Sequence, residues 1–272
     1  MNHPTHQTAP TQYVEANGIR FAYRRFGKPE GVPLVMNIHF TGTMDHWDPA
    51  VTDGLAQGRE VILFNNAGIA TSTGSVPESI EEMAANAAAF VDALGLAQVD
   101  VLGFSMGGLI AQALAIARPA LVRRLVLVGT GPRSGEAMST LTPEAQEIFS
   151  ASYDHPDHLW LGVHFTPSEA SQAAGRAFLE RFRLRKENRD PEAGEAVAGA
   201  QLAALAKWGA PREQPYAYLD AIRQPTLVVN GDDDVIIYSI NSWILQQNIP
   251  NAQLTSTRTP ITARCTSTPS AS

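Results

Sequence analysis

The chain is poor in the features on which several classes of protein depend. Its only cysteine is Cys265, so it cannot build a disulfide framework, which fits a reducing cytoplasm. Residues 1–10 lack the apolar stretch of a secretory signal, and no apolar run reaches the ~18 residues of a membrane-spanning helix. We therefore expect a soluble, cytoplasmic protein.

Basic clusters are also lacking. Lys and Arg total 20 against 27 Asp and Glu, the net charge is −7, and Lys and Arg form no long run. Phosphate backbones and anionic membranes bind basic patches, so neither nucleic acid nor a membrane is an expected partner. The length of 272 residues suits one α/β domain with room for a small insertion.

Short apolar runs alternate along the chain with longer helical patterns, which predicts a mostly parallel sheet flanked by helices. Asn17-Gly18 lies between two strand-like runs and is typical of a hairpin turn. Ser79 and Glu82 form a capping box that begins a helix over 79–94. Further strands are expected over 34–38, 61–64, 99–102, 125–128 and 226–230, and further helices over 109–117 and 242–248.

The pattern changes between residues 132 and 220. No strong strand signal is present there, and helices are expected over 142–152, 168–186 and 191–208, which indicates an inserted helical cap. The predicted organisation is a disordered N-terminus over 1–11, a core over 12–131 and 221–254, a cap over 132–220 and an irregular tail over 255–272.

The segment Gly103-Phe104-Ser105-Met106-Gly107 fits the pattern G-x-S-x-G between an expected strand and an expected helix. A nucleophile in this position occupies a strained turn, and its neighbours two residues away must be small to avoid clashes. The following helix adds partial positive charge where an oxyanion would form. Ser105 is therefore the candidate nucleophile.

This arrangement resembles the α/β-hydrolase fold family, in particular its capped esterases, lactonases and cofactor-free haloperoxidases, over about residues 13–254. The segment 37–42 resembles the family's oxyanion loop. The resemblance implies that the backbone N–H groups of Phe40 and Met106 form the oxyanion hole, with Thr41 as the alternative to Phe40. His39 is interpreted as a structural histidine of this loop and not as a base.

Two positions depart from the family pattern in the loop 64–72. Asn65 stands where an Asp is usual, and Ala70 stands where a second Gly is usual. Neither position carries chemistry directly.

The resemblance also implies a catalytic acid after a later strand. The Gly-x-x-Asp spacing from Gly231 selects Asp234, which would orient a histidine base, whereas Asp232 and Asp233 are interpreted as solvated turn residues. The base should follow Asp234, but none of the 7 histidines does, the last being His164. A serine without a general base is a poor nucleophile.

The composition of 255–272 suggests a reason for the missing base. When codons for residues 255–272 are read in a shifted frame, suitable wobble bases allow them to encode Leu-Tyr-Pro-Asp-Ser-Asp-His-Gly-Ala-Leu-Tyr-Gln-Tyr-Pro-Glu-Arg-Phe. This peptide contains an Asp-x-x-His-Gly type of segment, which the family has at this place. One hypothesis is therefore a frameshift that removes the base, the last strand and the last helix, and leaves the strand at 226–230 with an unpaired edge. The other is a genuine irregular tail on an inactive relative.

Aromatic side chains give the cap bulk. They are Phe149, Tyr153, Trp160, Phe165, Phe178 and Trp208. They could form an apolar pocket over Ser105, or pack the cap helices together, which is the more common role for any single one. His155, His158 and His164 lie beside Pro156 without a regular helical pattern, and we interpret them as solvated residues and not as metal ligands.

The resulting hypothesis is a serine hydrolase that acts on an ester or a related small acyl bond through an acyl-Ser105 intermediate. Asp234 is the acid, the base is absent from the chain, and neither a metal nor an organic cofactor is implied. The expected partner is a small-molecule acyl substrate. The alternatives are a non-catalytic binding protein with this fold, and cofactor-free perhydrolase or haloperoxidase chemistry.

Overall fold

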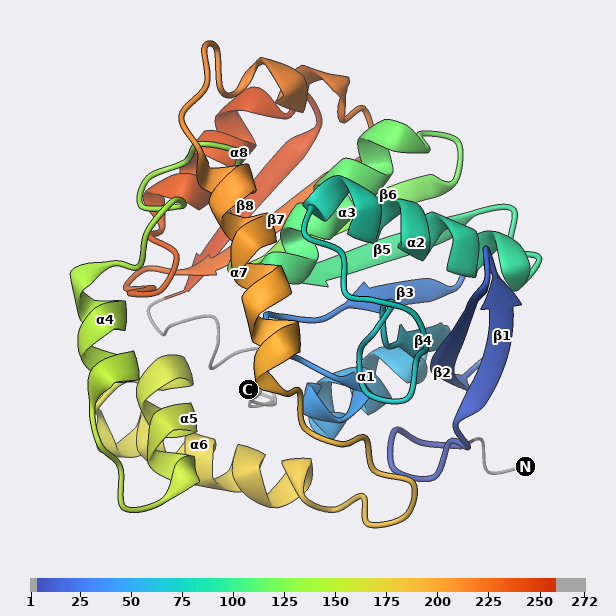
Figure 1. Ribbon diagram of the computed structural model, residues 1–272, viewed down its shortest axis with the longest axis horizontal. Coiled ribbons are helices and arrows are strands. Elements are labelled where there is room, and N and C mark those ends of the chain that lie inside the picture. Colours follow the sequence, from blue (N-terminus) through green and yellow to red (C-terminus); the bar gives the residue numbers. More distant parts are fainter. Residues whose placement is uncertain (1–3, 258–272) are drawn as a thin grey trace.

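The computed structural model describes residues 4–257, which form a mostly parallel, eight-stranded sheet flanked by helices (Figure 1). The strands are β1 (Gln12–Ala16), β2 (Ile19–Gly27), β3 (Leu34–Asn37), β4 (Glu60–Phe64), β5 (Val99–Phe104), β6 (Val122–Val128), β7 (Thr226–Gly231) and β8 (Ala252–Thr257). Their spatial order is β1-β2-β4-β3-β5-β6-β7-β8, antiparallel up to the β2–β4 pair and parallel beyond it. The expected α/β architecture is confirmed.

The N-terminal hairpin forms as its sequence predicts. Asn17 and Gly18 have φ angles of 51° and 77°, and Ala16 pairs with Ile19 across the turn. Positive φ at both turn residues matches the right-handed twist of the strands, which is why Asn-Gly is favoured there.

Helices cover both faces of the sheet. They are α1 (Pro49–Ala56), α2 (Ile80–Ala93), α3 (Met106–Ala117) and α8 (Ile240–Asn248), with short 3₁₀ helices η1 (Met44–His46) and η2 (Ala217–Ala221). Helices α2, α3 and α8 belong to one core cluster, and Ala56 of α1 belongs to the cluster on the opposite face. Of the capping box predicted at the start of α2, the Ser79 half is found: Ser79 Oγ accepts a hydrogen bond from the Glu82 N–H at 3.3 Å.

The inserted segment between β6 and β7 is helical, as expected. It contains α4 (Pro143–Ser150), α5 (Pro156–His164), α6 (Glu169–Phe182) and α7 (Glu195–Gly209). Helix α5 was not predicted, because Pro156 suggested a break; Pro156 instead occupies the first turn, where its missing N–H costs nothing. Helices α4–α6 lie to one side of the sheet, and α7 returns to it, with Ala204 and Trp208 in the main core (Figure 1).

The C-terminal edge corrects one expectation. Strand β7 is paired along its whole length with β8, from Thr226 opposite Ala252 to Gly231 opposite Thr257. The prediction of a missing last strand was therefore wrong, and residues 255–257 belong to a strand and not to an irregular tail. Leu227 on β7 is 37% exposed, and the expected loss of the last helix concerns residues outside the described part. Residues 258–272, with the shifted-frame histidine, lie outside the described part.

Residues 4–11 of the N-terminal segment pack against the rest of the protein, which differs from the disorder expected for this part of 1–11. His6 is 2% exposed, and its ring Nδ1 lies 2.9 Å from Thr52 Oγ1 in α1. Arg185 donates to the carbonyl oxygens of His6, Gln7 and Ala9. These contacts tie the N-terminal segment to both the core and the cap. None of the helices described in residues 4–257 is long and apolar enough to cross a membrane.

Candidate active site

Ser105 lies in the turn between β5 and α3, with φ 54° and ψ −121°. Such a conformation is strained for any residue with a side chain. The neighbouring glycines are required by space: a Cβ on Gly107 would lie 2.1 Å from the Asn37 carbonyl oxygen, and one on Gly103 would lie 2.3 Å from the Gly107 oxygen. The structure therefore shows the steric requirement for glycine at both positions that the motif predicted.

Hydrogen bonds hold the turn in place. The Ser105 N–H donates to the Val128 carbonyl at 2.9 Å, and the Ser105 carbonyl accepts from the Thr130 hydroxyl and the Gly108 N–H, each at 2.8 Å. Met106 is the first residue of α3, so its N–H points out of the helix N-terminus without an intrahelical partner. This amide is suited to stabilise negative charge beside Ser105.

The predicted oxyanion loop follows β3 as a tight turn. The Gly42 N–H donates to the His39 carbonyl at 3.0 Å, and Thr41 has a φ of 56°. The Thr41 N–H donates to Oε1 of Gln201 at 2.6 Å, whereas the hydrogen bonds found in residues 4–257 include none from the Phe40 N–H. Of the two alternatives, only the Phe40 N–H is without an acceptor among the described residues.

Asp234 lies in the turn after β7 and is 5% exposed. Its Oδ1 accepts hydrogen bonds from the N–H groups of Ile236 and Ile237 at 2.9 and 3.0 Å. Burial raises the pKa of the Asp234 carboxyl, and the two backbone donors oppose that shift. Asp232 and Asp233 are exposed, in keeping with their interpretation as solvated turn residues.

Ser105 and Asp234 line the same cavity, which has a volume of about 400 Å³. The remaining lining residues come from the oxyanion loop, from the ends of the core strands and from the cap. They are His39, Phe40, Thr41, Phe104, Gly129, Phe149, Leu159, Trp160, Val163, His164, Ile236 and Ile237. Among the described residues the lining is mostly apolar and contains neither Lys nor Arg, and the cavity is a pocket suitable for a small molecule beside the candidate nucleophile.

Histidines reach this cavity from two elements. His39 of the oxyanion loop donates from Nδ1 to the Phe40 carbonyl at 2.8 Å, which agrees with a structural role. His164 at the end of α5 is buried and stacks on Trp160, with ring centroids 5.1 Å apart, so its predicted solvation was wrong. Burial lowers the pKa of both His39 and His164 to about 3, which makes each a weak base.

The cap aromatics divide between the two roles considered for them. Phe149 and Trp160 line the cavity. Phe165 and Phe178 form a separate apolar cluster between α5 and α6, and Trp208 belongs to the main core. Three of the six therefore pack the protein together, Tyr153 is 36% exposed, and α5 provides much of the cavity wall.

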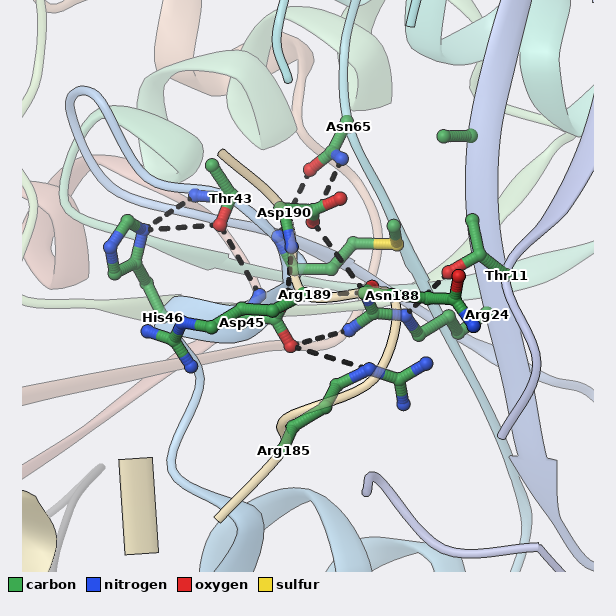
Figure 2. Close-up of polar contacts among 12 residues, drawn as sticks. Thr11, Arg24, Thr43, Asp45, His46, Asn65, Arg185, Asn188, Arg189 and Asp190 are labelled. Carbon is green, nitrogen blue, oxygen red and sulfur yellow. Dashed lines mark hydrogen bonds and ion pairs between the residues drawn. The ribbon is translucent and has the colours of Figure 1, made fainter. Parts of the chain in front are cut away.

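A buried cluster of charged and polar side chains contacts η1, the short helix that follows the predicted oxyanion loop (Figure 2). Arg24 on β2 donates to both carboxylate oxygens of Asp45 in η1 at 2.6 and 3.1 Å, and their side chains are 0% and 1% exposed. Asp190, between α6 and α7, donates its N–H to Asp45 at 2.7 Å. Asn65 accepts from the Met44 N–H and donates to Asp190, so an amide is needed at this position where the family usually has Asp.

Sequence reasoning missed Gln201 and this cluster. The alternation of Ala22, Arg24 and Phe26 on β2 places Arg24 on the core side, and a core-facing arginine is a signal of a buried ion pair. No sequence signal identifies Gln201. Within residues 4–257, no three His, Cys, Asp or Glu side chains are grouped so that they could hold a metal ion.

Comparisons with known proteins agree with this geometry. The family described as alpha/beta hydrolase fold matches residues 33–258. An alpha/beta hydrolase fold protein from Chitinophaga pinensis is 38% identical, with a TM-score of 0.86 over 93% of this chain and 90% of that one.

Named enzymes are also similar. A poly(3-hydroxyalkanoate) depolymerase of Ectopseudomonas oleovorans is 30% identical over 90% of this chain and 82% of its own length. A putative carbamate hydrolase, RutD, of Azorhizobium caulinodans is 30% identical over 82% of each chain. These relatives support hydrolase activity.

Proposed function

Because the chain belongs to the α/β-hydrolase family, we propose that it is a serine hydrolase that attacks an ester or a related small acyl bond with Ser105. The observation that supports this most directly is that the strained Ser105 and the buried Asp234 line one cavity of about 400 Å³. The substrate is a small molecule whose acyl group enters that cavity.

In the proposed reaction, Ser105 Oγ attacks the carbonyl carbon of the substrate. The carbonyl oxygen then becomes negative and accepts hydrogen bonds from the Phe40 and Met106 N–H groups. Collapse of the tetrahedral intermediate expels the leaving group and forms acyl-Ser105, which water hydrolyses. The serine proton must pass to a base, and the chain has no histidine after Asp234 for that step. We therefore propose that turnover by this chain is impaired.

A non-catalytic binding protein is the second candidate. It is favoured by one observation: no histidine follows Asp234, and the two that line the cavity among residues 4–257, His39 and His164, are buried, which lowers their pKa values to about 3. A base this weak takes the serine proton poorly. Cofactor-free perhydrolysis at Ser105 would use the same nucleophile and the same oxyanion hole.

Covalent labelling separates the two candidates. We expect a fluorophosphonate to modify Ser105 slowly but specifically, because the oxyanion hole still stabilises the adduct when the base is missing. Mass spectrometry of the peptide that contains Ser105 measures this rate. Ser105→Ala should abolish the modification, and Ser139→Ala, at an exposed serine outside the cavity, should not change it. Labelling no faster than in Ser105→Ala would favour the binding protein.

The cavity wall also predicts a preference among acyl groups. Among residues 4–257 it contains no Lys or Arg, so a carboxylate on the acyl chain would be buried beside the Asp234 carboxyl without a counter-charge. We expect phosphonate probes with a neutral alkyl tail to label Ser105 about 100-fold faster than probes whose tail ends in a carboxylate. A probe of equal length ending in a hydroxyl controls for size. Equal rates for the neutral and charged tails would contradict a neutral acyl substrate.

A further inference from the structure

The oxyanion loop contains an unfavourable conformation. His39, Phe40, Thr41 and Gly42 form a turn that is closed by the hydrogen bond from Gly42 N–H to the His39 carbonyl. Thr41 occupies its third position with a φ of 56°, which this position adopts in type II turns and which a β-branched residue rarely takes. An outlier of this kind persists only where the surroundings hold it.

The peptide between Phe40 and Thr41 is held at both ends. Its carbonyl oxygen accepts from the His39 Nδ1–H and from the Thr41 hydroxyl, each at 2.8 Å. Its N–H donates to Gln201 Oε1 at 2.6 Å. If the peptide rotated, the turn would become type I and Thr41 would relax to a negative φ. The bond to Gln201 opposes that rotation directly.

Gln201 is a fixed acceptor. It is 3% exposed and lies on α7, the cap helix that returns to the sheet, where Ala204 and Trp208 of the same helix are 0% and 2% exposed (Figure 1). Gln201 also lines a small cavity beside Asn37, His39 and Met106. A buried side-chain oxygen on a packed helix cannot move away without losing its hydrogen bond from the Thr41 N–H, and an unsatisfied buried amide is costly.

We infer that Gln201 is a positioning residue for the oxyanion hole. By accepting from the Thr41 N–H, it keeps the loop in the strained turn and leaves the Phe40 N–H, with that of Met106, to face the oxyanion. The inference deepens the proposed function and rests on it, because it concerns the step in which charge develops on the substrate oxygen. It also means that the position of helix α7 affects the rate of the reaction at Ser105.

The test compares variants that keep or lose the acceptor. We expect Gln201→Met, which has a similar shape but no oxygen, to lower the maximal rate of Ser105 phosphonylation about 10- to 100-fold with little change in probe affinity. Gln201→Glu should retain most of the rate, because a carboxyl oxygen accepts in either protonation state. Leu202→Ala, on the exposed side of the same helix, is the matched control.

Hydrogen exchange at the Thr41 amide gives a second readout that does not depend on labelling. This amide should exchange at least about tenfold faster in Gln201→Met than in the unchanged protein and in Gln201→Glu. Gln201→Asn, whose shorter side chain cannot reach the loop, should behave like Gln201→Met in both measurements. A protein that shows these exchange rates but no labelling of Ser105 would overturn the proposed function alone. Labelling at an unchanged rate in Gln201→Met would overturn the role of Gln201.

Discussion

A chain with residues 255–272 replaced by the shifted-frame segment is expected to hydrolyse activated esters about 10⁴-fold faster than the chain as given. The segment adds a histidine shortly after β8, the strand that pairs with β7 and therefore ends beside the Asp234 turn. An imidazole there could take the proton of Ser105, while Asp234 holds it in one tautomer. Initial rates with p-nitrophenyl esters measure the difference.

Asp234→Asn shows whether the gain comes from a triad. The amide oxygen can still accept from Ile236 and Ile237, so the turn should keep its shape. In the restored chain the substitution should lower the rate by about 10⁴-fold, because the histidine loses its orienting carboxylate. In the chain as given it should change labelling of Ser105 only slightly, since no imidazole follows Asp234. Equal losses in both backgrounds would mean that Asp234 acts without a histidine.

The coding DNA tests the origin of the segment independently, because residues 258–272 lie outside the described structure. We propose a frameshift before the histidine. That predicts wobble bases across codons 255–272 that spell the Asp-x-x-His-Gly segment in another frame, with an open frame that continues into a helix. Wobble bases that encode no histidine in either other frame would instead identify the segment as a genuine tail on a chain whose site lacks the histidine base.

The parts of the site that sequence could predict depend on local geometry. Gly103, Ser105 and Gly107 are fixed by clashes within a few residues and with the adjacent strand, so their spacing alone indicates the turn. Asp234 follows β7 at the Gly-x-x-Asp spacing, and its side chain accepts hydrogen bonds from the N–H groups of Ile236 and Ile237. The same is true of Asn17-Gly18, whose turn type follows from the φ angles that these residues tolerate.

The parts that sequence could not predict depend on contacts between distant segments. Gln201 meets Thr41 across 160 residues, and Arg24 meets the Asn188 carbonyl across 164. His164 lines the cavity because α5 forms, and the sequence concealed α5 because Pro156 can either break or begin a helix. Neither a sequence motif nor a hydrophobic periodicity indicates which surfaces the inserted helices will cover. The roles of these residues can therefore be identified only from the folded structure.

The largest expected loss of stability comes from Arg24→Met. Arg24 and Asp45 are almost fully buried, and removing the arginine takes away the bidentate partner of Asp45 and leaves this carboxylate beside Asp190 with the more distant Arg185, at 3.8 Å, as a counter-charge. Breaking a buried pair in this way costs about 3–5 kcal/mol of unfolding free energy. Denaturant unfolding at pH 7 measures it. Arg118→Met is the matched control, because its bidentate pair with Asp92 is about half exposed and should cost less than about 1 kcal/mol.

The same pair predicts how the loss depends on pH. Burial would raise the pKa of Asp45, but the hydrogen bonds and charge of Arg24 outweigh it and lower that pKa. A lowered pKa contributes stability that is present above roughly pH 4 and is lost as the pH falls through the folded value. In Arg24→Met, burial without the arginine should raise the pKa of the Asp45 carboxyl, which can then become protonated at mildly acidic pH. The difference in unfolding free energy between the two proteins should therefore be greatest near neutrality and shrink toward pH 4, whereas a constant difference would mean that lost packing, and not the charge of Asp45, is responsible.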